Sequence, residues 1–142
     1  MLFRSRLGTE PVPEPGPDEV LVRVTTVGIC GSDLHWLEEG SIGDAQVTKP
    51  LVLGHEFAGV VASSESSLSR FRVAVDPAIP CMKCEFCLGG NPNLCSDLHF
   101  AGHGLDDGAL REYMAWPERC LHPLPDSISD EEGALQIGRA HV

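Results

Sequence analysis

The clearest alternation of apolar and polar positions lies in residues 19–27 (EVLVRVTTV), where Val20, Val22 and Val24 share one face of an extended chain. Because β-branched side chains favour strands, this segment is predicted to be a half-buried strand. The preceding residues 11–18 (PVPEPGPD) hold four prolines and one glycine. Proline restricts φ and lacks a backbone donor, so an extended connector is predicted before the strand.

Further along the chain, short apolar runs are separated by Gly, Ser or Pro. Runs of this length indicate barrel or sandwich strands rather than helices. The predicted strands are residues 51–53, 57–62, 73–75, 110–115 and 119–121. The pattern therefore predicts a mainly β fold.

Two short helices are also predicted. Ser32 or Asp33 is suited to cap a helical turn that runs through Leu37 and closes at Gly40, since either side chain can accept a hydrogen bond from a free backbone N–H. Residues 129–132 (SDEE) form the S-x-x-E pattern of a capping box, with acidic side chains at the positive end of the helix dipole.

Composition and charge narrow the class of protein. The chain has 142 residues, of which 42% are hydrophobic and 22% charged, as in ordinary globular domains. No run approaches the roughly 20 apolar residues of a membrane helix, and no apolar stretch follows Arg4 and Arg6. We therefore expect a soluble, cytoplasmic protein that does not bind a membrane. The net charge of −11 argues against nucleic acid as a partner.

Four of the six cysteines form a compact cluster, C-x2-C-x2-C-x7-C, at Cys81, Cys84, Cys87 and Cys95. A reducing compartment favours metal over disulfides, and cysteines two residues apart bridge poorly to one another. An iron–sulfur cluster is the stronger rival, but its signature places the fourth cysteine after three residues, followed by Pro. Here the gap is seven and Ser96 follows, so a closed structural zinc site is favoured.

A second group of zinc-ligand types comprises Cys30, His55 and Glu56. Each taken singly has a simpler explanation: a small buried thiol, a core histidine and a surface charge. Together they lie next to glycines at the ends of predicted strands, in residues 28–35 (GICGSDLH) and 54–56 (GHE). That arrangement suits an open catalytic zinc site, although spacing alone does not show that they converge.

Three ordered motifs, GICGSDLH at 28–35, GHEFAG at 54–59 and CMKCEFCLGGNPNLC at 81–95, resemble the N-terminal catalytic domain of zinc-dependent medium-chain alcohol dehydrogenases. Within this family, the segments CGSDLH and AVDPAIPC are most similar to the sorbitol (polyol) and threonine dehydrogenase branch. The resemblance covers residues 11–136. It implies a GroES-like β-barrel with a catalytic zinc site and, at residues 81–95, a structural zinc lobe.

The resemblance also implies roles for single residues. Cys30 and His55 would bind the catalytic zinc, with Glu56 as a direct, water-mediated or exchanging ligand. Ser32 would pass the alcohol proton onward and His35 would be a later member of the relay, whereas Asp33 would orient the ligand histidine. Simple helix capping for Ser32 and Asp33, and a solvated side chain for His35, are the alternatives.

The implied activity is hydride transfer from a zinc-bound alkoxide to NAD(P), with two zinc ions per chain and a small alcohol, polyol or amino-alcohol as substrate. No G-x-G-x-x-G follows a predicted strand, so NAD(P) would bind only through a Rossmann domain that this chain lacks. We expect this piece to be inactive alone and the full-length protein to be a homo-oligomer. A non-catalytic zinc or iron–sulfur module is the alternative.

Two departures from the family pattern stand out. Phe71 runs directly into Arg72, where the family carries a turn resembling K-P-G-D, which puts the local strand register in doubt. Residues 137–142 (IGRAHV) resemble a translated sequencing adapter, where the family would continue with Glu-Pro-Leu. We therefore interpret these six residues as read-through, and resequencing the locus tests that interpretation.

Overall fold

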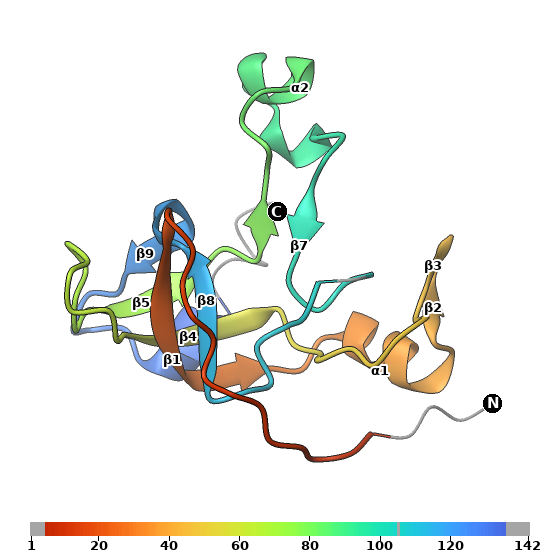
Figure 1. Cartoon of the computed structure of the whole chain (residues 1–142), viewed down its shortest axis with the longest axis horizontal. Helices are drawn as coiled ribbons and strands as arrows, with labels where there is room; N and C mark the ends of the chain where they lie inside the picture. Colours follow the sequence, from red (N-terminus) through yellow and green to blue (C-terminus); the bar gives the residue numbers. More distant parts are fainter. Residues whose placement is uncertain (1–4, 105, 136–142) are drawn as a thin grey trace.

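The computed structural model describes residues 5–104 and 106–135, and its centre is one antiparallel β-sheet. Within these residues the sheet has five strands in the order β8-β1-β4-β5-β9. Figure 1 shows it as a curled sheet with the remaining elements beside it. Its strands are β1 (Glu19–Gly28), β4 (Glu56–Val61), β5 (Arg72–Val75), β8 (Tyr113–Pro117) and β9 (Leu121–Pro123). The predicted mainly β fold class is confirmed.

The other described elements are short, and two groups of them extend away from the sheet (Figure 1). One group is α1 (Gly31–Glu38) with the hairpin β2 (Ser41–Ile42) and β3 (Ala45–Gln46). The other is a lobe carried on β6 (Ala78–Ile79) and β7 (His99–Phe100), with α2 (Glu85–Leu88) and the 3-10 turn η1 (Pro92–Leu94). The elements η2 (Glu118–Cys120) and α3 (Asp130–Ala134) lie near the C-terminal end.

The core lies on the sheet, where Val22, Phe57, Val73 and Val75 are fully buried. Trp116 meets Phe57 edge to face at 6.4 Å between ring centroids. Its indole Nε1 donates a hydrogen bond to the Asp76 carbonyl at 2.8 Å, which satisfies the buried N–H. The alternating valines of the N-terminal strand thus face this core, as their spacing predicted.

Most of the predicted strands are present. The strand predicted at 19–27 is confirmed as β1, and those at 57–62 and 73–75 correspond to β4 and β5. The prediction for 110–115 begins too early, because β8 starts at Tyr113. The prediction for 119–121 is mostly wrong, since residues 118–120 form a 3-10 turn before β9.

The strand predicted at residues 51–53 is wrong. This segment is hydrogen-bonded to the loop that precedes β8, and within the described part of the chain it belongs to no sheet. It ends at Gly54, whose φ of +91° turns the chain before β4 begins. A positive φ of this kind is accessible to glycine at little cost, so the turn separates the apolar run from the strand that follows.

The predicted caps are partly confirmed. In α1 the N-cap is Cys30, not Ser32 or Asp33, because Asp33 occupies the third helical position and accepts the Cys30 backbone N–H at 2.9 Å. The helix ends at Glu38, and Gly40 closes it as predicted: its φ is +69° and its N–H bonds to the His35 carbonyl at 3.2 Å. Asp33 therefore completes a cap rather than beginning one.

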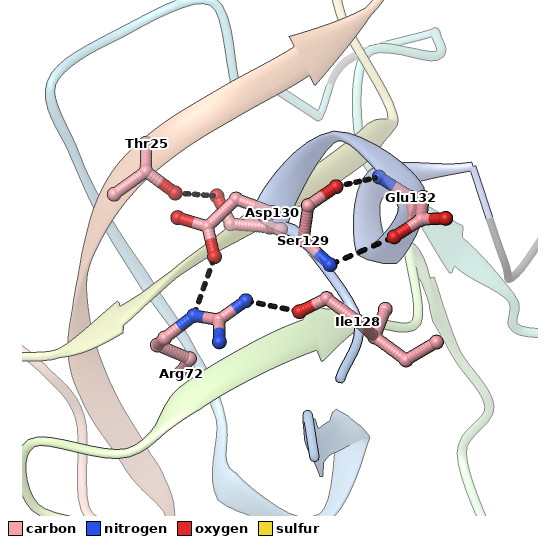
Figure 2. Close-up of polar contacts among 7 residues, drawn as sticks. Thr25, Arg72, Ile128, Ser129, Asp130 and Glu132 are labelled. Carbon is pink, nitrogen blue, oxygen red and sulfur yellow. Dashed lines mark hydrogen bonds and ion pairs between the residues drawn. The ribbon is translucent and has the colours of Figure 1, made fainter. Parts of the chain in front are cut away.

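The capping box of α3 is confirmed: Ser129 and Glu132 each accept the other's backbone N–H, at 3.2 and 2.9 Å (Figure 2). The guanidinium of Arg72, on β5, donates to Asp130 at 2.8 Å and to the Ile128 carbonyl (Figure 2). These bonds fix the start of α3 on the sheet, where the helix packs against β1, β4 and β5. The interpretation of residues 137–142 as read-through lies outside the described residues.

The shortened connection between β4 and β5 leaves their pairing intact. Phe57 pairs with Val75 and Val60 with Arg72 in continuous antiparallel register. The loop closes through Arg70, which adopts a φ of +68°, and through a hydrogen bond from its N–H to the Val61 carbonyl at 2.9 Å. The register of this strand pair is therefore regular without a K-P-G-D turn.

Candidate metal centres

The three residues Cys30, His55 and Glu56 come together at one end of the sheet. Cys30 stands between β1 and α1, and Glu56 is the first residue of β4. Because Gly28, near the end of β1, pairs with Glu56, the two strand ends lie side by side. One ligand atom from each of the three lies within 4.8 Å of the others. Thiolate, imidazole and carboxylate are zinc ligands, and three of them leave a fourth position open.

The buried side chain of Asp33 contacts the segments that carry Cys30 and His55. It is only 3% exposed, and its two oxygens accept the backbone N–H groups of Cys30 and Gly54 at 2.9 and 3.0 Å. Its Oδ1 also lies 3.6 Å from Nδ1 of His55. A carboxylate on Nδ1 favours a proton there and leaves Nε2 as the atom available to a metal.

The two candidate relay residues lie in different surroundings. Ser32 Oγ is 3.4 Å from His55 Nε2, so its hydroxyl lies at the candidate metal site. His35 is 60% exposed and pairs with Glu39 on its own helix at 3.2 Å. The structure therefore brings Ser32 to His55, and it places His35 on the solvent-facing side of α1.

Sequence reasoning missed an aromatic contact at the site. The ring of Phe100, on β7, lies 5.6 Å from the His55 ring, and His103 lies 6.4 Å from Phe100. His103 in turn meets the buried Trp36 of α1 edge to face at 5.2 Å. No local signal marks Phe100, because it lies 100 − 55 = 45 positions from His55 in the sequence and meets it only in the folded chain.

A loop that precedes β8 supports the segment just before His55. The Gly108 N–H donates to the Val52 carbonyl at 2.7 Å, and the Leu110 N–H to the Leu53 carbonyl at 2.9 Å. In return, the Val52 N–H donates to the Asp107 carboxylate at 2.9 Å. These bonds hold residues 52–54 in place and so set where β4 begins.

The second centre is the four-cysteine lobe. One sulfur from each of Cys81, Cys84, Cys87 and Cys95 lies within 4.8 Å of the others, and all four are free thiols. Backbone N–H groups point at these sulfurs, including Cys81 N to Cys95 Sγ at 3.3 Å and Cys84 N to Cys81 Sγ at 3.4 Å. Four sulfur donors in this arrangement match a closed tetrahedral zinc site. The disulfide alternative is not what the structure shows.

The electrostatics of the lobe favour a bound cation. Backbone N–H groups of Cys87 and Ser96 lower the pKa of Cys84 to about 6. Desolvation and the neighbouring sulfurs, Cys84 first among them, raise the pKa of Cys87 to about 12. Cys87 therefore resists ionising beside its neighbours, and a divalent cation would supply the charge that allows it.

The sixth cysteine, Cys120, takes no part in either group. It is buried at the end of η2, and its thiol donates to the Ala78 carbonyl at 3.6 Å. Burial raises its pKa, which suits an inert core thiol.

Among the described residues, no helix is long and apolar enough to span a membrane.

The described residues thus form a curled antiparallel sheet with a protruding four-cysteine lobe and a Cys/His/Glu group at the end of the sheet. The model of the alcohol dehydrogenase GroES-like domain matches residues 16–126, and the chain belongs to this family. The resemblance drawn from the three motifs is thereby confirmed.

The curated relatives belong to the polyol branch. The sorbitol dehydrogenase of Bacillus subtilis (strain 168) is 46% identical over 134 residues, which is 92% of this chain and 38% of that protein. The D-xylulose reductase A of Aspergillus niger is 43% identical over 139 residues, which is 94% of this chain and 39% of that protein. This chain therefore spans less than half the length of the relatives it matches, and those relatives are oxidoreductases.

Solved structures agree with this assignment. Galactitol-1-phosphate dehydrogenase from Escherichia coli superposes with a TM-score of 0.80 at 32% identity, covering 91% of this chain and 37% of the other. L-idonate 5-dehydrogenase from Escherichia coli K-12 superposes with a TM-score of 0.75 at 37% identity, covering 79% of this chain and 34% of the other. A putative zinc-binding dehydrogenase from Sinorhizobium meliloti 1021, solved with NADP, gives a TM-score of 0.71.

Proposed function

We propose that this chain is the zinc-binding catalytic domain of an NAD(P)-dependent alcohol or polyol dehydrogenase. The observation that carries the proposal is the convergence of Cys30, His55 and Glu56, whose ligand atoms lie within 4.8 Å of one another. The relatives' names add sorbitol and xylulose as examples of the substrate class. We propose a small alcohol, polyol or amino-alcohol as the substrate of this protein.

The donor set fits zinc, with Cys30, His55 and Glu56 as protein ligands and one position left for substrate. When bound, zinc supplies Lewis acidity that favours loss of the alcohol proton. The protein's own part is to hold the three ligands in place. Asp33 orients the His55 ring, and the loop before β8 holds the backbone of the residues that precede His55. We propose that the Ser32 hydroxyl passes the alcohol proton onward, giving up its own proton as it accepts one, and that His35, exposed on the same helix, is a later member of the relay.

A second zinc would sit in the lobe of residues 81–95 and act structurally. Four sulfur donors leave no position for substrate, so this ion would contribute to folding rather than to catalysis. We assign the domain to residues 11–136, within which the family match at 16–126 falls. The free thiols of the described residues are typical of a reducing compartment, which supports a cytoplasmic location.

NAD(P) is proposed to bind through a further domain in a protein of the relatives' length. The chain covers 38% of the sorbitol dehydrogenase it matches and carries no G-x-G-x-x-G after a strand. Hydride transfer therefore requires more than this domain supplies, and we propose that the domain alone is inactive. The homo-oligomer proposed for the full-length protein rests on the family resemblance alone.

Metal analysis tests the proposal directly. Two zinc ions per chain are expected, whereas one zinc ion, or stoichiometric iron, would instead support a non-catalytic zinc or iron–sulfur module. In the full-length protein, Cys30→Ser and His55→Ala are expected to abolish NAD(P)-linked alcohol oxidation, and Cys95→Ser is expected mainly to lower stability. Retained turnover in Cys30→Ser would overturn the catalytic assignment.

A further inference from the structure

Gly28 faces the candidate metal ligand Glu56 across two paired strands. The two residues are direct partners in the antiparallel ladder of β1 and β4. In an ordinary pair the two Cβ positions lie about 5 Å apart on the same face of the sheet, whereas here a Cβ at Gly28 would lie only 3.2 Å from that of Glu56. The size of the residue at position 28 therefore decides how much room the Glu56 side chain has.

A β-bulge at Thr25 sets this pairing. Val24 pairs with Gly59, but Thr26 pairs with Ala58, so Thr25 is an extra residue in β1 and the register shifts by one. The Thr25 hydroxyl lies 3.3 Å from the Ala58 carbonyl at the same point. Without the bulge, Val27 would face Glu56, and a branched side chain would occupy the space that Gly28 leaves free.

That space is filled by the Glu56 carboxylate. A Cβ atom added to Gly28 would lie 2.8 Å from Glu56 Oε2 and 3.2 Å from Glu56 Cβ, closer than ordinary van der Waals contact. It would also lie 3.5 Å from Leu135 Cδ2, at the end of α3, which limits movement on that side. We propose that Gly28 is a positioning residue: by lacking a side chain, it lets the Glu56 carboxylate turn toward Cys30 and His55. This inference rests on the metal site proposed above.

The clash at Gly28 differs in kind from those at glycines needed for the fold. At Gly59, an added Cβ would lie 2.5 Å from the Arg23 carbonyl oxygen, which belongs to the rigid backbone of β1. At Gly28, the nearest atom is the tip of a flexible side chain, and the backbone is not in the left-handed region. Gly28→Ala is therefore expected to leave the sheet folded and to displace the Glu56 side chain, carboxylate included.

The test measures metal binding by the 142-residue chain, without any activity assay. The apo chain is loaded with one equivalent of zinc to fill the four-cysteine lobe, and cobalt(II) is then titrated and followed by its visible absorption and by chelator competition. Wild type is compared with Gly28→Ala, Glu56→Ala and the double variant. Gly31→Ala is the matched control, since nothing lies within 4 Å of a Cβ at that position.

Gly28→Ala is expected to weaken cobalt binding by about 10- to 100-fold and to alter its absorption band, as when a residue that orients a ligand is lost. Gly31→Ala should match wild type. In the Glu56→Ala background, adding Gly28→Ala should change cobalt affinity less than twofold, because the carboxylate it displaces is already gone. A purely structural effect of Gly28 would instead be the same in both backgrounds.

Each remaining outcome is decisive. If wild type takes up a second metal and Gly28→Ala binds it equally well, the positioning role is overturned while the metal site stands. If wild type takes up no metal beyond the lobe, the proposed site fails and the role of Gly28 fails with it. If Gly28→Ala does not fold, folding of the double variant would support the clash with Glu56, and its failure to fold would overturn the proposal.

Discussion

The carboxylate of Asp33 lies 3.6 Å from His55 Nδ1 while it accepts two backbone N–H groups, one from each side of the candidate metal site. A single buried side chain thus joins the N-cap of α1 to the turn before β4. Capping and ring orientation depend on the same two oxygens, so a change at Asp33 affects the fold and the site together.

Asp33→Asn is expected to lower the free energy of unfolding by about 1–3 kcal/mol, since an amide has one acceptor oxygen and leaves one of the two N–H groups unpaired. Cobalt(II) affinity at the Cys30/His55/Glu56 group is expected to fall by about 10- to 100-fold. Urea unfolding and metal competition measure the two effects. Asp44→Asn, at an exposed position in the β2–β3 turn, should change neither. Unchanged metal affinity in Asp33→Asn would contradict the orienting role.

In the Cys95→Ser variant, the metal content is expected to fall by one ion per chain. The lobe of residues 81–95 is expected to unfold while the sheet stays intact. Cys95 is the most buried of the four lobe thiols, and its sulfur accepts N–H bonds from Cys81 and Asp97. Cleavage by trypsin after the exposed Lys83 should become much faster in the variant, and chelator should have the same effect on wild type. Cys120→Ala is the control and should keep both metal content and protection at Lys83.

The contact between Arg72 and Asp130 predicts a pH-dependent contribution to stability. Hydrogen bonds from Thr25 and Arg72 lower the pKa of Asp130 in the folded protein. A lowered folded pKa means that the contribution is complete above the unfolded value of about 3.9 and is lost as pH falls toward the folded pKa. Both side chains are partly exposed, so Asp130→Asn is expected to cost about 1 kcal/mol or less at pH 7.

The difference between wild type and Asp130→Asn should therefore shrink as pH is lowered below about 4. Urea midpoints at pH 7, 5 and 3 measure it, with Asp126→Asn in the exposed loop before α3 as the control. A difference that stays constant across this range would show that the carboxylate of Asp130 does not contribute through its charge.

Gly108→Ala is expected to destabilise the domain by about 3 kcal/mol, because the added methyl group meets backbone rather than a movable side chain. A Cβ at this position would clash with the Gly54 carbonyl oxygen and would lie 2.5 Å from the Leu53 carbonyl oxygen. The shift in urea midpoint, compared with Gly31→Ala, measures the effect. A wild-type midpoint would show that residues 52–54 are not held rigidly by this loop.

Several features followed from local sequence alone. The alternating valines of β1 predicted its buried face, the S-x-x-E pattern predicted the α3 cap, and the cysteine spacing predicted a metal lobe. Each depends on residues within about fifteen positions of one another. For such features, side-chain periodicity, capping chemistry and short loops leave few alternatives.

Other features were mispredicted or missed for a common reason. The run at 51–53 has the composition of a strand, but its hydrogen bonds go to a loop more than fifty residues away. Phe100 lies 100 − 55 = 45 positions from His55 in the sequence, and their rings meet only in the folded chain. Partners at this separation in sequence are chosen by packing of the whole sheet, which no local pattern encodes.

The sequence by itself determined the family, the residue types of the two candidate metal groups and the spacing of the four-cysteine cluster, because these depend on residue identity and short spacing. Only the tertiary structure decided that Cys30, His55 and Glu56 share one site, and that a bulge at Thr25 places Gly28 rather than Val27 opposite Glu56. The physical reason is strand register: a shift of one residue changes which side chain faces which, and the shift is set by pairing across the sheet.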